Sequence, residues 1–157
     1  MTLNKKAQEY YKLKDKQAKE LAEFTDKYCG FAFNNNQRQA LLKKFKFNSW
    51  PELEESCTAF AGCGVILKNK LHDFQQLNEK LIAELHEQMT KDHEFAQKVF
   101  EIELANYECA FSYRYDEALA SIGFNNGYMS LREKGLEDSY AKAKVAYIDD
   151  MQMQGYI

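Results

Sequence analysis

Residues 71–89 read LHDFQQLNEKLIAELHEQM, and this stretch decides the fold class. Its apolar side chains recur mostly every three or four residues, which places them on one face of an α-helix. They are Leu71, Phe74, Leu77, Leu81, Ile82, Leu85 and Met89. One Pro and seven Gly among 157 residues leave few residues for the tight turns of a β-sandwich or barrel. The chain is therefore predicted to be all-α or mainly α.

Outward from this stretch, the pattern predicts one compact bundle of five to seven helices, a single domain over residues 1–157. The expected helices cover residues 3–28, 37–45, about 49–58, 71–89, 93–111 and 116–122, with a last helix opening at Ser130. Short irregular or extended inserts are expected near residues 29–34 and 61–68. Whether residues 70–111 form one helix or two is left open by the pattern.

Polar residues before several of these segments predict helix starts. Asn36 is the expected N-cap of the second helix, and Asp92 the expected cap before residues 93–111. Ser49-Trp-Pro-Glu52 has the pattern of a capping box, with Pro in the first turn. Ser130-Leu-Arg-Glu133 has the same pattern and is predicted to open the last helix.

The net charge of −3 is unevenly distributed along the chain. Residues 1–50 hold eleven Lys or Arg and five Asp or Glu, a local +6, whereas the remaining ten and nineteen give −9. The basic part suits nucleic acid and the acidic part suits a basic partner. A solvated lysine face on a long helix is the favoured explanation of the basic part, because no compact Arg cluster accompanies it. No apolar run reaches the length of a membrane span and no signal peptide is expected, so we predict a cytoplasmic protein with reduced thiols.

The residue types that carry catalysis or bind metals do not occur here at the spacings those sites need. The cysteines, at 29, 57, 63 and 109, lack the paired spacing of zinc knuckles. His72, His86 and His93 do not match a helical zinc motif, and we expect them to be solvated surface residues. The Gly62 and Gly64 turn is too short for a phosphate loop, and both glycines are expected to provide a positive φ or a close backbone approach. No cofactor, no metal and no enzymatic activity are therefore predicted.

Aromatic residues offer the best candidates for partner contacts, because Trp and Tyr often anchor interfaces. For those of the irregular segment, filling the core between the long helices is the favoured interpretation and partner binding the alternative. The candidate partner-binding residues are Phe31, Phe33, Trp50, Tyr113, Arg114, Tyr115, Asp116 and Glu117. Residues 103–123 are expected to fold as helix, turn and helix, with Leu104, Tyr107, Phe111, Leu119 and Ile122 against the core. Asn106 and Glu108 are interpreted as structural hydrogen-bonding residues.

Three stretches together resemble the signatures of a small uncharacterised family found in phages and bacteria. They are Phe31-Ala-Phe33 with Asn34-Asn-Asn-Gln37, then Ala61-Gly-Cys-Gly-Val-Ile-Leu-Lys68, and then Glu103-Leu-Ala-Asn-Tyr-Glu108 followed by Asp116–Gly123. On this resemblance, which covers about residues 30–124, Gln37, Gly62, Gly64, Asn106 and Glu108 belong to the structural motif. The family pattern has Asn-His-Glu where this chain has Asn106-Tyr107-Glu108, so a function of that histidine would be absent here.

The resemblance implies a phage or mobile-element accessory protein, not a reaction. Small acidic proteins in that setting commonly bind and block a host protein. The leading hypothesis is therefore a non-enzymatic helical binding protein that inhibits a host defence complex, such as a CRISPR nuclease or ribonucleoprotein. A second hypothesis is nucleic-acid binding by Lys5, Lys6, Lys12, Lys14, Lys16 and Lys19, and a third is an enzyme or metal protein built on Asn106, Glu108 and Cys109. The partner, its binding face and the oligomeric state are left open.

Overall fold

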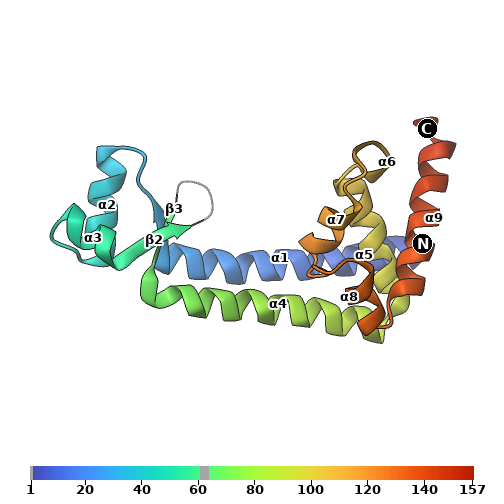
Figure 1. Ribbon diagram of the computed structural model, residues 1–157, viewed down its shortest axis with the longest axis horizontal. Coiled ribbons are helices and arrows are strands. Elements are labelled where there is room, and N and C mark those ends of the chain that lie inside the picture. Colours follow the sequence, from blue (N-terminus) through green and yellow to red (C-terminus); the bar gives the residue numbers. More distant parts are fainter. Residues whose placement is uncertain (1, 61–63) are drawn as a thin grey trace. The chain divides into compact units, whose positions relative to one another are not determined.

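The computed structural model describes residues 2–60 and 64–157, and it confirms the mainly α fold class. The first part contains α1 (Thr2–Tyr28), β1 (Cys29–Phe31), α2 (Asn35–Phe45), α3 (Trp50–Ser56) and β2 (Cys57–Phe60). The second contains β3 (Gly64–Leu67), a 3₁₀ turn (Lys68–Lys70), α4 (Leu71–Lys91), α5 (His93–Asn106), α6 (Cys109–Ser112), α7 (Tyr115–Ser121), α8 (Tyr128–Glu133) and α9 (Glu137–Met153) (Figure 1).

Helices in the two described ranges outnumber the five to seven expected, because two expected helices are interrupted. Residues 93–111 break at Glu108, whose backbone is left-handed with φ +49°. The last helix is divided by Gly135, with φ +67°, into α8 and α9. Ser130 therefore does not cap the last helix; it lies inside α8, where its Oγ accepts a hydrogen bond from Asn126 N at 2.9 Å.

The chain divides into two compact units. Unit 1 consists of Met1–Lys14 with Leu81–Ile157, and unit 2 is Asp15–Lys80. Both boundaries fall inside helices, α1 and α4. The single domain expected over residues 1–157 stays a prediction.

Unit 2 is built on a small antiparallel sheet with the strand order β1-β3-β2. Phe31 and Phe60 lie opposite Gly64 and share its face of the sheet. On this face the Phe60 ring packs edge-on against the Phe74 ring of α4, with the ring centres 4.7 Å apart. On the other face, a Cβ at Gly30 would come within 2.3 Å of Leu41 Cδ2 in α2. Within unit 2, the sheet thus lies between α2 on one face and Phe74 of α4 on the other.

The extended inserts expected near 29–34 and 61–68 correspond to β1 and β3, but β2 differs from the prediction. The helix expected to reach Thr58 ends at Ser56, and Cys57–Phe60 pairs with β3 instead. Four residues carry too short a periodic signal to separate a strand from a helix end, and pairing with a distant strand decides between them.

Helix starts follow side-chain caps, one of them at a different residue from the expected one. Asn34 caps α2, not Asn36, because Asn34 is the residue in extended conformation and its Oδ1 accepts from Gln37 N at 2.9 Å. Ser49 caps α3 as predicted, with Glu52 Oε2 accepting from Asn48 N at 2.8 Å. Asp92 caps α5 as predicted and separates it from α4, so residues 70–111 are not one helix.

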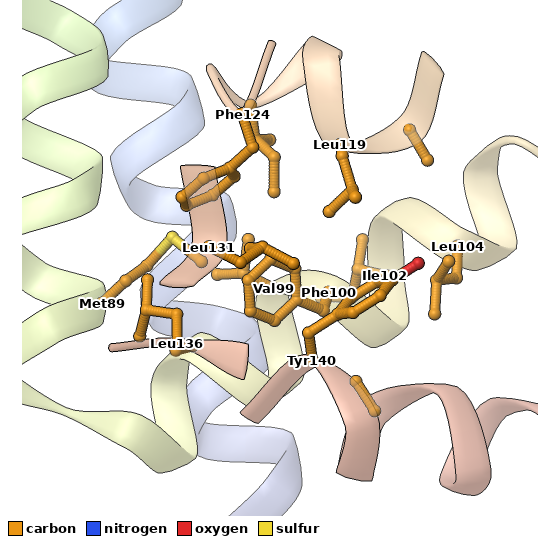
Figure 2. Packing of buried hydrophobic residues seen from close by; sticks show 14 of the residues in the cluster. Met89, Val99, Phe100, Ile102, Leu104, Leu119, Phe124, Leu131, Leu136 and Tyr140 are labelled. Carbon is orange, nitrogen blue, oxygen red and sulfur yellow. The ribbon is translucent and has the colours of Figure 1, made fainter. Parts of the chain in front are cut away.

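The hydrophobic core of unit 1 surrounds α5 (Figure 2). Phe95, Val99 and Phe100 of this helix are almost completely buried. Side chains from the other elements of the unit cover them: Met89, Leu119, Phe124, Leu131, Leu136 and Tyr140. In the part of the chain described, no helix is both long enough and apolar enough to cross a membrane.

Two polar side chains are buried in unit 1, and one of them, His86, was expected at the surface. His86 is not a solvated histidine; its Nε2 donates to the Ile122 carbonyl oxygen at 2.7 Å, and its ring stacks on Phe124. Glu103 is also buried, and its Oε1 accepts a hydrogen bond from Tyr10 Oη at 2.7 Å. Each is satisfied by a partner distant in the chain.

Burial of His86 predicts a pH dependence of stability. Burial lowers the pKa of this imidazole below 6.5, and the nearby Lys134 lowers it further, although the hydrogen bond to Ile122 opposes them. The unfolded chain therefore binds a proton more readily, so this contribution is present above pH 6.5 and is lost as the pH falls below it. When the pH is lowered from about 7.5 to about 5, the thermal unfolding midpoint measured by circular dichroism should decrease. The decrease should be larger in the wild type than in His86→Gln. Identical pH profiles for the two proteins would contradict this expectation.

Candidate functional site

Residues 107–117 of unit 1 follow α5 and include α6 and the first turn of α7. We name this segment the α6–α7 corner. Glu108 and Tyr113, which flank the single turn of α6, both have left-handed backbones, with φ +49° and +56°. Non-glycine residues adopt this conformation at a cost of about 1–3 kcal/mol each, and only where the surrounding structure imposes it. The geometry of the corner is therefore imposed by its contacts.

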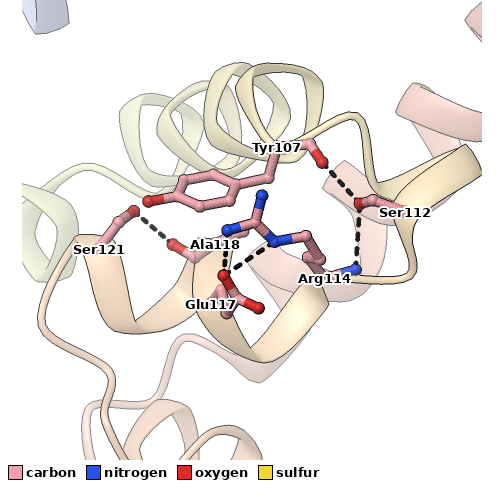
Figure 3. A network of polar contacts seen from close by, with 6 residues as sticks. All are labelled: Tyr107, Ser112, Arg114, Glu117, Ala118 and Ser121. Carbon is pink, nitrogen blue, oxygen red and sulfur yellow. Dashed lines mark hydrogen bonds and ion pairs between the residues drawn. The ribbon is translucent and has the colours of Figure 1, made fainter.

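A polar network fixes the corner from within (Figure 3). Ser112 Oγ donates to the Tyr107 carbonyl oxygen at 2.6 Å and accepts from Arg114 N at 3.2 Å. The Arg114 guanidinium donates to Glu117 Oε2 through Nε, at 2.8 Å, and through Nη2, and it lies 5.3 Å from the centre of the Tyr107 ring. The hydrogen bond from Arg114 lowers the pKa of the Glu117 carboxyl, so this pair stays charged at neutral pH.

The underside of the corner is anchored in the core of unit 1. Cys109, Ala118 and Leu119 are buried, and Tyr147 Oη accepts from Ala110 N at 3.1 Å. Burial raises the pKa of the Cys109 thiol, which leaves it protonated and poorly suited to nucleophilic chemistry. Asn106 and Glu108 are exposed beside it. The hypothesis of an enzyme built on these three residues stays a hypothesis.

Aromatic rings point outward from this anchored turn. Tyr113 is 79% exposed and Phe111 is 53% exposed. Of the other candidates, Arg114, Asp116 and Glu117 are exposed, whereas Tyr115 is half-buried under Lys144, whose Nζ lies 4.6 Å from its ring centre. The prediction that Phe111 packs against the core is wrong, because the break at Glu108 turns α6 away from the periodicity of α5.

The second group of candidates, Phe31, Phe33 and Trp50, lies in unit 2. The rings of Phe31 and Phe33 are stacked, with centroids 5.7 Å apart and planes 7° apart. Trp50 is half-buried against the core of Leu41, Leu53 and Cys57, so it fills space as the favoured interpretation expected. Arg38 lies over its ring at 5.0 Å.

The residues assigned to the structural motif have separate positions. Gln37 Oε1 accepts from Phe33 N at 2.7 Å and so fixes the start of α2. Gly64 allows a close approach, since a Cβ there would be 3.1 Å from Phe31 Cε1. Gly62 lies outside the described residues.

The lysine-rich start of α1 is partly neutralised within unit 1. Lys6 pairs with Asp92 and with Glu9, and Lys14 pairs with Glu103 at 3.3 Å.

A cavity of about 410 Å³ in the same unit is lined by the Lys98–Glu101 ion pair and by Ile102, Tyr147 and Asp150. In residues 2–60 and 64–157, no three His, Cys, Asp or Glu side chains are grouped so that they could hold a metal ion.

Comparison with known proteins finds one match. The family described as "Family of unknown function (DUF7659)" matches residues 9–146, which include most of both units. No curated protein and no solved structure matches the chain. The sequence therefore connects this molecule with a family, and no reaction comes with that family.

Proposed function

This chain belongs to the family of unknown function DUF7659, and from that premise we propose that it is a non-enzymatic module that binds a partner protein through the α6–α7 corner. The observation that carries the proposal is the exposure of Phe111 and Tyr113 on a turn that is held rigid. A rigid aromatic anchor loses little conformational entropy on binding, which is why aromatic residues dominate the energy of protein interfaces.

The charged residues around these rings complement the anchor. Arg114 and Glu117 are exposed but paired with each other, so a partner meets a locally neutral rim instead of a single charge. Asp116 adds an exposed carboxylate beside them. An apolar centre with a polar rim is the usual composition of an interface between proteins.

Truncation of Tyr113 tests the proposal. The protein is immobilised and exposed to a bacterial lysate, and proteins retained in stoichiometric amount are quantified. Tyr113→Ala should weaken retention by roughly thirtyfold or more, because an interface anchor contributes about 2 kcal/mol or more. Phe111→Ala should act in the same direction.

Val145→Ala is the matched control, since Val145 on α9 is also apolar and 61% exposed but lies outside the corner. It should retain the partner as the wild type does. The proposal fails if no stoichiometric protein is recovered, or if Tyr113→Ala and Val145→Ala bind equally well.

The motif resemblance to a family of phages and bacteria supports a narrower form of this proposal. In that form the protein acts in the bacterial cytoplasm and the partner is a host defence complex, such as a CRISPR effector. Expression of the wild type or of Val145→Ala should then restore phage plating on a strain with active CRISPR immunity, whereas Tyr113→Ala should not. Plating that stays equally low with the wild type would remove the narrower form and leave the corner itself to the lysate experiment.

A further inference from the structure

The segment from residue 27 to residue 51 of unit 2 contains no acidic residue. We name it the acid-free segment; its cations are Lys27, Arg38, Lys43, Lys44 and Lys46. None of these five forms an ion pair with any described residue, whereas at least eight other Lys or Arg side chains do. Positive charge that the fold leaves unneutralised is the electrostatic mark of a polyanion site.

The same segment carries a flat aromatic platform. Phe31 is 54% exposed and Phe33 is 64% exposed, although they stack on each other. Gly64 seats the Phe31 ring and Gln37 fixes the backbone of Phe33, so both rings are positioned before any ligand arrives. Exposed rings of this kind are the surfaces on which unpaired bases stack.

The platform adjoins α2, whose last turn carries cations, although Phe31 lies on the sheet face opposite this helix. α2 begins just after Phe33 and returns beside β1, since Lys44 Nζ donates to the Cys29 carbonyl oxygen at 2.7 Å. Lys43 lies beside Lys44 in the last turn of α2, and Lys46 is the C-cap of this helix. In α3, which follows the segment, Glu52 and Glu54 accept hydrogen bonds from Asn48 N and Trp50 Nε1.

From this arrangement we propose that the β1–α2 face of unit 2 binds single-stranded nucleic acid, with bases stacked on Phe31 and Phe33 and phosphates near Lys43, Lys44 and Lys46. The face lies in unit 2 and uses no residue of the α6–α7 corner, so it is a site beyond the proposed protein-binding function. It also differs from a site on the lysines of α1, some of which are already paired.

Fluorescence anisotropy with labelled oligonucleotides tests the site. A length of about 20 nucleotides is sufficient, because aromatic single-strand sites span about 4–16 nucleotides. Oligo-dT and oligo-U are titrated separately, which distinguishes DNA from RNA, and a duplex of the same length is the third ligand. A single strand should bind more tightly than the duplex. Its log affinity should fall with log salt at about −0.7 for each neutralised phosphate.

Two variants inside the face and three outside it locate the binding. Phe33→Ala should weaken single-strand binding roughly tenfold by removing a stacking surface. Lys43→Glu should also weaken it and reduce the salt slope by about 0.7. The controls Phe111→Ala, Lys12→Glu and Lys142→Glu change an exposed ring or an exposed lysine elsewhere and should leave the affinity near that of the wild type.

Several results would overturn the proposal. Absence of wild-type binding at about 50 mM salt would do so, because electrostatic binding is strong at low salt. Equal weakening by Lys12→Glu or Lys142→Glu would assign the effect to overall charge instead of this face. Equal affinity for the duplex, or no effect of Phe33→Ala, would remove base stacking, and a Phe33→Ala effect on retained lysate protein alone would make the platform a protein contact.

Discussion

Replacing Gly123 with alanine is expected to destabilise unit 1 by about 2–5 kcal/mol. Gly123 has φ +89°, a conformation that costs an L-residue about 1–2 kcal/mol. An added Cβ would also lie 2.4 Å from Ile82 Cγ2 and 3.0 Å from His86 Nε2. Because His86 Nε2 donates to the neighbouring Ile122 carbonyl oxygen, the new methyl group would displace a buried hydrogen bond. Urea denaturation followed by far-UV circular dichroism measures the loss.

Gly135→Ala is the matched control for this effect. Gly135 also has a positive φ, +67°, but among the described residues no atom beyond its chain neighbours lies within 4 Å of the position its Cβ would take. Alanine there should cost only the conformational part, about 1–2 kcal/mol. If the two variants lose the same stability, the close packing of Gly123 against Ile82 and His86 does not contribute, and the expectation is wrong.

Periodicity predicted the helices of this chain well wherever a helix packs one continuous face. The stripe from Leu71 to Met89 became α4, and the caps at Ser49 and Asp92 lie where their side chains can meet free backbone N–H groups. Such features depend on residues close in sequence, so the sequence alone contains them.

The features that sequence reasoning missed depend on partners far along the chain. β2 exists because Cys57–Phe60 pairs with β3, and His86 is buried because Ile122 supplies an acceptor. The α6–α7 corner shows the same limit. Tyr113 was expected at a binding site and is exposed, but Phe111 becomes exposed only through the left-handed backbone of Glu108, which no residue pattern indicates.

Replacing Phe100 with alanine is expected to cause a loss of stability of about 3–5 kcal/mol, the range for removing a fully buried ring. Phe100 on α5 is almost completely buried and joins two other parts of unit 1. Its ring centre lies 5.7 Å from that of Phe124, which precedes α8, and 5.3 Å from that of Tyr140 on α9. Alanine would remove both contacts at once, and neither neighbour can follow because each is packed against the rest of the core.

Phe111→Ala is the control of the same residue type in this experiment, and it separates folding from binding. Because the Phe111 ring is 53% exposed, its loss should cost well under the Phe100 value, about 1 kcal/mol or less, in urea denaturation. The same variant should nevertheless lose partner retention, whereas a core residue affects binding only through the folded fraction. Equal destabilisation by the two variants would mean that the α6–α7 corner is part of the core, and its aromatic side chains would then not be available to a partner.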